Sequence, residues 1–481
     1  MRTHWQILVG GELRDAQSGE TIETTNPANG AVIGTFPRCD AQDVDDAVRA
    51  AASAFESWRQ TNPLERARCV LGLADLIAQH AEELALLDVT ENGSPIREMR
   101  NDANIAIAAL RFFAGLALQL RGETIPGEHG RLNYTLMAPF GVVGRIVPFN
   151  HPMMFAAAKS VAPLIAGNTV VIKPSEHTST SALALGELAA QVFPPGVVNV
   201  VTGYGEEAGD ALVTHPGVRR VAFTGSAEIG RRIQARAATH VVKTVTLELG
   251  GKNPIVVCAD ADIEAAIDGA LRGMAFTWQG QSCGSTSRLL VQRSLHEEFV
   301  ARLGERMDAL RAGSPADEST DTGAIVHRRQ FEKVLSYLEM GRDEGLAVVA
   351  GGGPPDDPAL AAGMFVRPTL FDNVRPDSRL AQEEIFGPVL VAMPFETYDE
   401  ALAIANGVSL GLTASIYTRD LATAHRFARD VEAGYVWVND TQRHVPGTDY
   451  GGFKDSGVGR EEGVAELVSY AQIKNVNVSF G

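Results

Sequence analysis

Apolar and polar positions repeat with a helical period over much of the first quarter of the chain. From about residue 40 to 120, segments such as DVDDAVRAAASAFESW and ARCVLGLADLIAQHAEELALLDV carry apolar residues three and four positions apart, which predicts amphipathic helices. The turn-rich stretch RGETIPGEHGRLNYTLMAPFG follows and favours a hairpin or an extended arm.

After this arm, short β-branched runs alternate with helical segments. The runs GVVGRIVPF, NTVVIKPS, VVNVVTG, RRVAFTGS and VTLELGG are separated by segments such as PMMFAAAKSVAPLIAG and SALALGELAAQVF. This alternation predicts a parallel sheet covered on both faces, and such sheets bind ligands at the carboxyl ends of their strands. A second alternating region, with NPIVVCAD, SRLLVQRS and PVLVAMPF, begins near residue 250 and predicts a second α/β domain.

The tail ELVSYAQIKNVNVSF ends in a strand-like alternation. No strand pattern near it in sequence offers a partner, so we expect it to join the edge of another sheet, including one in another subunit. The whole pattern predicts an α/β protein with two doubly wound, Rossmann-like parallel-sheet domains and a small β oligomerisation arm.

Composition narrows the ligand and the compartment. The 481 residues are 45% hydrophobic and carry a formal net charge of −17, so the chain lacks the basic character that nucleic-acid binding requires. The most apolar stretch is interrupted by Lys159 and Asn168, which argues against a membrane span. The four cysteines form neither a zinc pattern nor a disulfide framework, and the first residues lack a signal-peptide pattern. We therefore expect a cytoplasmic protein without a metal site.

One cysteine has unusual neighbours. Cys283 lies in FTWQGQSCGSTSR, directly between Ser282 and Gly284. Inert cysteines are normally packed among hydrophobic side chains, whereas a nucleophilic thiol needs access and neighbours that favour the thiolate. A packing role is the commoner one for a lone cysteine, so a catalytic interpretation requires partners elsewhere in the chain.

Two strand ends offer such partners. Glu248 ends an apolar run before two glycines, where a carboxylate is unfavourable unless it is paired or serves as a base. Asn150 follows another run, beside His151, and its amide could donate to an oxyanion. A structural ion pair for Glu248 and a turn-stabilising role for Asn150 are the alternatives.

Two further strand ends could hold a nucleotide. Lys173 and Glu176 follow the run TVVI and offer an ammonium donor and a carboxylate acceptor, which suit a ribose diol. Gly225 and Ser226 lead from a strand straight into a helix, whose free N–H groups suit a pyrophosphate. The complete G-x-G-x-x-G fingerprint is absent, so a solvated loop and an ordinary strand-to-helix turn remain as alternatives.

Together and in this order, these stretches resemble the NAD(P)-dependent aldehyde dehydrogenase superfamily. The most specific pieces are LELGGKNP, GQSC, EEIFGPVL and GGFKDSGVGREE, and the resemblance runs from NPANGAVIGTFP to GREEG. It implies NAD-dependent oxidation of an aldehyde through a thioester on Cys283, with Glu248 activating the hydrolytic water. It further implies that Asn150 holds the oxyanion and that Lys159 and Glu461 help to relay the proton.

The resemblance also implies the ligand-binding positions. Glu176 would disfavour a 2′-phosphate, so NAD is the expected cofactor. The residues expected to bind it are Ile146, Pro148, Lys173, Glu176, Gly205, Gly225, Ser226, Leu249, Glu384 and Phe386.

Several pocket positions depart from the family pattern. The substrate pocket is expected to include His151, Phe155, Ala158, Ser282, Gly284, His444 and Tyr450. Ala158 replaces a large aromatic residue of many relatives, two histidines stand where aromatic residues are common, and DYGG replaces PFGG. We therefore expect a bulky, aromatic or oxygenated aldehyde or a semialdehyde.

The implied organisation assigns residues 1–118 and 141–249 to NAD binding and residues 250–455 to catalysis. Residues 119–140 and 466–481 would form the oligomerisation arm and terminal strand of a homodimer or homotetramer. A CoA-acylating semialdehyde dehydrogenase is one alternative, although Glu248 argues against it because such relatives generally lack this glutamate. A non-catalytic, crystallin-like binding or structural protein is another.

Overall fold

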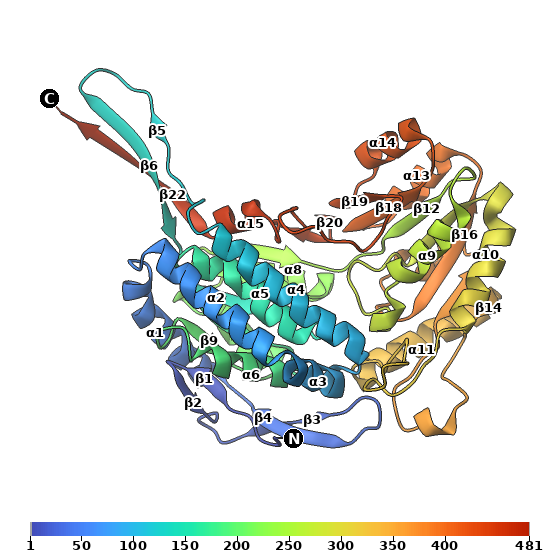
Figure 1. Ribbon diagram of the computed structural model, residues 1–481, viewed down its shortest axis with the longest axis horizontal. Helices are drawn as coiled ribbons and strands as arrows, with labels where there is room; N and C mark the ends of the chain where they lie inside the picture. The colour runs from blue at the N-terminus through green and yellow to red at the C-terminus, as the bar shows by residue number, and fades with distance from the viewer. Residues whose placement is uncertain (1, 481) are drawn as a thin grey trace.

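Two α/β bodies and a projecting β arm make up the protein. The computed structural model describes residues 2–480. The first body holds the N-terminal helices, the second follows along the chain, and the arm extends away from the first body with the C-terminus at its tip (Figure 1). The predicted fold class, two doubly wound sheets and a small β arm, is confirmed.

The first sheet has a parallel centre between antiparallel edges. Strands β9, β8, β7, β10 and β11 run parallel, while β1 and β21 join antiparallel. Every residue of β7 and β8 is buried, as expected for strands covered on both faces. In sheet order the strands are β2 (Glu12–Arg14), β1 (Ile7–Val9), β9 (Val198–Val200), β8 (Thr169–Lys173), β7 (Val142–Ile146), β10 (Val218–Thr224), β11 (Thr244–Glu248) and β21 (Gly457–Val458).

Helices cover this sheet because their apolar stripes face it. The first helix is opened by a capping box between Asp40 and Asp43, which satisfies its free N–H groups. Helices α5 and α6 pack on the sheet beneath α2, α3 and α4, and α1, α7 and α8 form the other layer. Their bounds are α1 (Ala41–Trp58), α2 (Pro63–Gln79), α3 (Ala81–Asn92), α4 (Ile96–Gly115), α5 (Pro152–Ile165), α6 (Thr180–Ala189), α7 (Asp210–Thr214) and α8 (Ala227–Ala237).

The second sheet is parallel except at the β14 edge. Its order is β14 (Ala347–Ala350), β15 (Thr369–Asp372), β16 (Val389–Phe395), β13 (Arg288–Gln292), β12 (Pro254–Val257), β18 (Thr413–Tyr417) and β19 (Tyr435–Val438). The helices of this body are α9 (Ile263–Gly273), α10 (Arg293–Asp308), α11 (Arg328–Asp343), α12 (Arg379–Gln382), α13 (Tyr398–Asn406) and α14 (Leu421–Asp430).

The arm shows which strand the C-terminal tail pairs with. The terminal strand β22 (Ala471–Ser479) pairs antiparallel with β6 (Arg131–Pro139) of its own chain, and β5 (Thr124–Ile125) completes the sheet. The tail thus joins the edge of another sheet, as expected, and the partner strand lies in the same chain. The two strands are separated by more than 300 residues, and strand patterns carry no information about partners so far apart in sequence. The short helix α15 (Val464–Ser469) leads into the tail.

The smaller elements complete the chain. They are β3 (Thr21–Thr25) with β4 (Val32–Pro37), β17 (Leu410–Gly411) with β20 (Phe453–Lys454), and the short turns η1 (Gly205–Gly209), η2 (Phe276–Trp278) and η3 (Pro358–Leu360).

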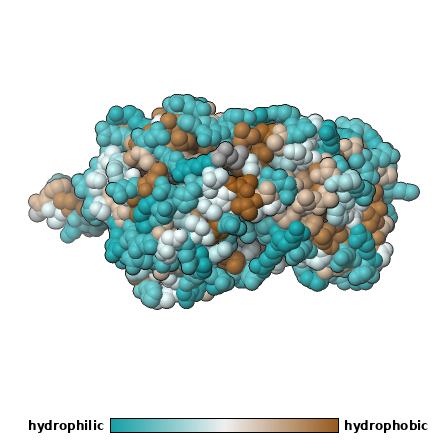
Figure 2. All heavy atoms as spheres, turned by 90° about the horizontal axis from the view of Figure 1, so that it is seen from below, coloured by the Kyte–Doolittle hydropathy of each residue, from teal (hydrophilic) through white to brown (hydrophobic). Residues whose placement is uncertain are grey.

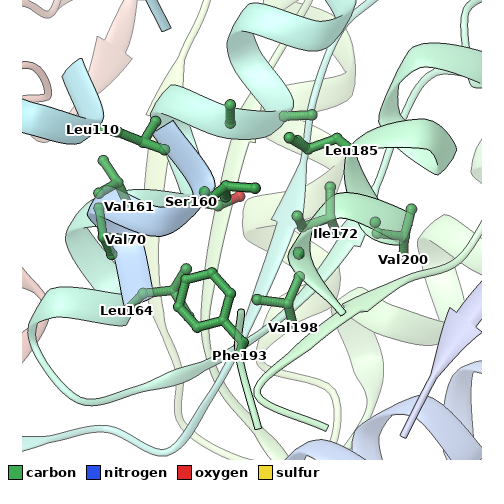
Figure 3. A pocket seen from close by; sticks show the side chains of 15 residues that line it. Val70, Leu110, Ser160, Val161, Leu164, Ile172, Leu185, Phe193, Val198 and Val200 are labelled. Atoms are coloured by element: carbon green, nitrogen blue, oxygen red, sulfur yellow. The ribbon is translucent and has the colours of Figure 1, made fainter. Parts of the chain in front are cut away.

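An apolar cavity lies inside the helix layer of the first body. Side chains such as Leu110, Leu164 and Phe193 surround it, and Ser160 brings the hydroxyl seen in the close-up (Figure 3). Its volume is about 20 Å³, which is close to the minimum for one water molecule. The cavity is too small for a substrate and is a packing gap.

Candidate active site

Cys283 lies in a tight loop between η2 and β13, and the loop is shaped by its backbone. Gln279 and Gly280 both have left-handed φ values, +54° and +67°. A Cβ at Gly280 would collide with the carbonyl oxygen of Gly387, so glycine is required there. The side-chain amide of Asn253 donates to the Cys283 carbonyl oxygen at 2.8 Å and fixes the loop to the start of the second sheet.

The thiol belongs to a partly buried residue that lies close to acidic side chains. Burial raises the pKa of Cys283 to about 12, a hydrogen bond with Tyr450 opposes this rise, and the Glu248 carboxylate adds to it. The Sγ atom lies 3.9 Å from the Tyr450 hydroxyl oxygen. A nucleophilic cysteine needs neighbours that favour the thiolate, whereas burial and the nearby carboxylates favour the thiol here.

Glu248 ends β11 as a buried carboxyl group without partners. It is 4% exposed, and neither side-chain oxygen makes a hydrogen bond within the described residues. Burial, followed by repulsion from Glu461, raises the pKa of Glu248 well above its usual value. A Cβ at Gly451 would stand 2.8 Å from Glu248 Oε1, so the glycine after Tyr450 lets the chain pass close to the carboxyl group.

Lys159 and Glu461 meet in a buried ion pair. Lys159 Nζ lies 2.5 Å from Glu461 Oε2, and Arg145 Nη1 lies 2.7 Å from Glu461 Oε1. Burial alone would raise the pKa of Glu461, but Arg145 and Lys159 hold it at about 2. Glu461 is therefore a fixed anion close to Glu248.

Asn150 is buried in the turn after β7. It is 3% exposed, and its Oδ1 atom has no hydrogen-bond partner in the part of the chain that the structure describes. The preceding carbonyl, of Phe149, accepts from Asn92 Nδ2 at 2.6 Å, which holds the turn in place.

The expected cofactor residues gather at the carboxyl edge of the first sheet. Ile146 and Lys173 end the adjacent strands β7 and β8 in direct register, and Pro148 follows β7. Lys173 Nζ lies 3.2 Å from Glu176 Oε2. Burial lowers the pKa of Lys173, with Glu176 opposing; burial alone would raise the pKa of Glu176, but Lys173 brings it below its usual value.

The next strand end provides a helix N-terminus. Gly225 and Ser226 lie between β10 and α8, and Ser226 caps the helix by accepting from the Ile229 amide at 3.4 Å. Leu249 packs so close to α8 that a Cβ at Gly230 would stand 2.6 Å from it. At Gly205, an added Cβ would meet no atom within 4 Å, so this edge is open.

The second body contributes Glu384 and Phe386 to the same edge. Glu384 Oε1 accepts from the Gly251 amide at 3.0 Å, and a Cβ at Gly250 would collide with the Glu384 carboxylate. Phe386 has a left-handed φ of +57° and packs edge-on against Phe149 at 5.7 Å. Glu384 thus contacts the segment that links β11 of the first body to β12 of the second.

These groups fit a dinucleotide. An ammonium beside a carboxylate supplies the donor and acceptor for a ribose diol, the α8 N-terminus suits a pyrophosphate, and Glu384 could accept from a second ribose. The open edge at Gly205 leaves room beside them.

The expected substrate-pocket residues carry two histidines, each backed by an acid. His151 Nδ1 lies 2.8 Å from buried Asp102, and its ring contacts Phe155 at 5.2 Å. His444 Nδ1 lies 2.8 Å from Glu462 Oε2. Ser282 and Gly284 flank the thiol, Tyr450 reaches it, and Ala158 is partly buried one residue before Lys159.

Sequence reasoning missed the residues that bind and position the predicted site residues. Asn253 was visible inside LELGGKNP, but only the structure shows its bonds to the cysteine loop. Asp102 and Glu462 lie in stretches that gave no signal for their histidine partners. Arg145 lay hidden in an apolar strand run, where a buried charge was itself a signal for a counter-ion.

Two absences complete the description. Within residues 2–480, no cluster of three or more metal-ligating side chains is found. No helix in that range is long and apolar enough to cross a membrane.

Comparisons with known proteins cover nearly the whole chain. The family model described as the aldehyde dehydrogenase family matches residues 13–476. Aldehyde dehydrogenase tropH of Talaromyces stipitatus is 44% identical over 485 residues, covering 99% of this chain and 94% of that protein. Hydroxyisobutyraldehyde dehydrogenase of Mycolicibacterium austroafricanum is 40% identical over 475 residues, covering 98% of this chain and 93% of that protein. The NAD⁺ complex of an aldehyde dehydrogenase from Bacillus cereus superposes with a TM-score of 0.96 at 40% identity, covering 99% and 96%.

Proposed function

The chain belongs to the aldehyde dehydrogenase family and is an NAD-dependent enzyme of that family, and we propose that Cys283 is its nucleophile. The thiolate adds to the carbonyl carbon of an aldehyde, and the Asn150 amide with the Cys283 backbone N–H receives the oxyanion. When bound, NAD supplies the acceptor for the hydride that the Cys283 adduct gives up, which leaves a thioester. In this proposal the first sheet binds the cofactor and the second carries the thiol.

The observation that carries the proposal is the unpartnered, buried carboxyl group of Glu248 near the thiol. A carboxylate without hydrogen bonds is unfavourable in a protein interior, and its raised pKa makes it a stronger base than an ordinary glutamate. Glu248 takes a proton from the water that attacks the thioester, which releases the acid and regenerates the thiol. Lys159 and Glu461, already paired, pass the proton onward.

We propose a bulky, aromatic or oxygenated aldehyde or a semialdehyde as the substrate. Small Ala158 leaves room, and His151 and His444 add polar groups whose Nδ1 atoms are occupied by acids. The Nε2 atom of each ring therefore remains to meet oxygen atoms of a substrate.

We further propose a homodimer or homotetramer in the cytoplasm. The arm exposes apolar side chains (Ile125, Leu132, Leu136, Ile473 and Phe480), and Figure 2 shows apolar atoms where it projects from the body. Exposed apolar patches of this kind favour subunit contacts. All four cysteines are free, which supports a reducing compartment.

The decisive test is the Glu248→Gln variant in a rapid-mixing assay of NADH absorbance over a panel of aldehydes. Addition to Cys283 and hydride loss do not need the hydrolytic water, so the first turnover should survive. We expect a burst of NADH about equal to the enzyme present, then a steady state slower by on the order of 10² to 10⁴. Intact-protein mass spectrometry should find the acyl adduct on Cys283.

The control is Cys283→Ser, which should lose both phases yet still bind NAD. If Glu248→Gln kept the wild-type steady-state rate, another residue would have to be the base. Transfer of the acyl group to CoA would then explain thioester breakdown better than hydrolysis. Wild-type enzyme given CoA should form no acyl-CoA. Failure of every aldehyde to yield NADH would instead favour a non-catalytic protein.

A further inference from the structure

Tyr450 points its hydroxyl group at the catalytic thiol. Its oxygen lies 3.9 Å from Cys283 Sγ, and no other hydrogen-bond partner of this hydroxyl is found in the described chain. Tyr450 is 5% exposed. A buried phenol normally finds a partner, and here the sulfur is that partner.

The backbone of Tyr450 is fixed in place. Its N–H donates to the Glu461 carbonyl at 2.8 Å, and the Glu461 N–H donates to the Tyr450 carbonyl at 2.7 Å. This reciprocal pair ties Tyr450 to the residue that binds Lys159. The position of the hydroxyl is therefore set by the same segment that sets the ion pair.

The ring of Tyr450 is also held. It packs against His444 at 4.8 Å and against Tyr435 at 5.7 Å between ring centroids. His444 is anchored in turn by Glu462. A hydroxyl group on a ring packed against two other rings is preorganised toward the sulfur.

We propose that Tyr450 donates a hydrogen bond to the Cys283 thiolate and holds it ready for attack on the substrate. This rests on the proposed role of Cys283 as the nucleophile. The phenol keeps its proton because burial, followed by the Cys283 charge, raises the pKa of Tyr450 well above its usual value. The hydroxyl is then the donor and the sulfur the acceptor.

The charges around the thiol make this donor important. Glu248 and Glu384 both disfavour the thiolate, whereas Lys159 is a cation that favours it. The hydrogen bond from Tyr450 lowers the pKa of Cys283 more than Lys159 does and is the main effect that opposes burial. Lys159 also forms ion pairs with Glu461 and Glu462. A hydrogen bond to a charged group is stronger than one between neutral groups.

The test measures alkylation of Cys283 by iodoacetamide as a function of pH, without aldehyde, followed by intact-protein mass spectrometry. Tyr450→Phe keeps the ring and removes only the donor. We expect the curve of alkylation rate against pH to move up by about one pH unit in Tyr450→Phe. At each pH below the midpoint of Cys283 ionisation, alkylation of the variant should therefore be about tenfold slower than that of the wild type. NAD binding and thermal unfolding should match the wild type.

The matched control is Tyr435→Phe in the same aromatic cluster. Tyr435 bonds Thr448 Oγ1 at 3.0 Å and not the sulfur, so its alkylation profile should be that of the wild type. Equal profiles for Tyr450→Phe and wild type would overturn the inference while leaving the nucleophile in place. Turnover by Cys283→Ser would instead overturn the proposed function itself.

Discussion

At the scale of single residues, two buried glutamates of the site have pKa values shifted in opposite directions. Burial raises the pKa of Glu248, whereas Glu461, equally buried, is held at about 2 by Arg145 and Lys159. The difference lies in the partners, because only Glu461 has cations in contact. Environments that separate the pKa values of two carboxyl groups assign them different roles, here a general base and an anion paired with cations.

Glu176 should set the choice between NAD and NADP. Its carboxylate, held by Lys173, repels a 2′-phosphate and accepts from a free 2′-hydroxyl. The preference is the ratio of kcat/KM with NAD to kcat/KM with NADP. Glu176→Ser should lower this ratio by about tenfold, which corresponds to about 1.4 kcal/mol of transition-state stabilisation. Glu187→Ser on α6, where the glutamate pairs with Arg2, is the control and should change nothing. A wild-type enzyme faster with NADP would contradict this role.

Sequence motifs predict local groupings well and distant ones poorly. Lys173 and Glu176 are three residues apart beside a strand end, so their contact follows from local structure. The contact between Cys283 and Tyr450 joins residues 167 positions apart, and that between His151 and Asp102 joins different elements. No periodicity encodes such contacts, because they depend on how whole elements pack.

At the scale of elements, the short strand β21 joins the segment after Tyr450 to the first sheet. Glu248 in β11 lies opposite Gly457 in β21. Gly457 has a φ of +148°, and a Cβ there would collide with the Leu247 carbonyl, so glycine is required for this pairing. The run GGFKDSGVGREE was recognisable in the sequence, but its place as a sheet edge was not, because two-residue strands leave no alternation to detect.

The ion pair at the end of this segment should be a major contributor to stability. Glu461→Gln leaves Arg145 and Lys159 buried without their shared counter-ion, which should lower the free energy of unfolding by about 3–5 kcal/mol. Urea unfolding followed by circular dichroism measures the change. Asp377→Asn, which breaks the exposed pair with Arg375, should leave the free energy of unfolding nearly unchanged, because water screens exposed ion pairs. Equal losses in the two variants would refute a special role for the buried pair.

At the scale of the whole molecule, the arm projects from the body and exposes apolar side chains of β6 and β22. Its main ladder joins β22 to β6 over nine residue pairs, so neither strand is a free tail. The strand character of both segments was predictable from their sequences, whereas their mutual pairing within one chain was not. In the proposed oligomer, a second subunit would cover these exposed apolar side chains.

The last prediction concerns this arm. Deleting residues 471–481 removes β22 and leaves the edge of β6 unpaired, and unpaired strand edges favour aggregation. Size-exclusion chromatography with light scattering should show monomers or aggregates in place of a defined oligomer.

Ile473→Ser should weaken assembly less than the truncation does, because it removes one apolar side chain that is 71% exposed and keeps the pairing of β22 with β6. Leu421→Ser is the matched control, since Leu421 is equally exposed but belongs to α14, a helix that lies far from the arm in Figure 1. It should leave the mass unchanged. A well-folded truncation that keeps the full oligomeric mass would show that the arm does not hold the subunits together.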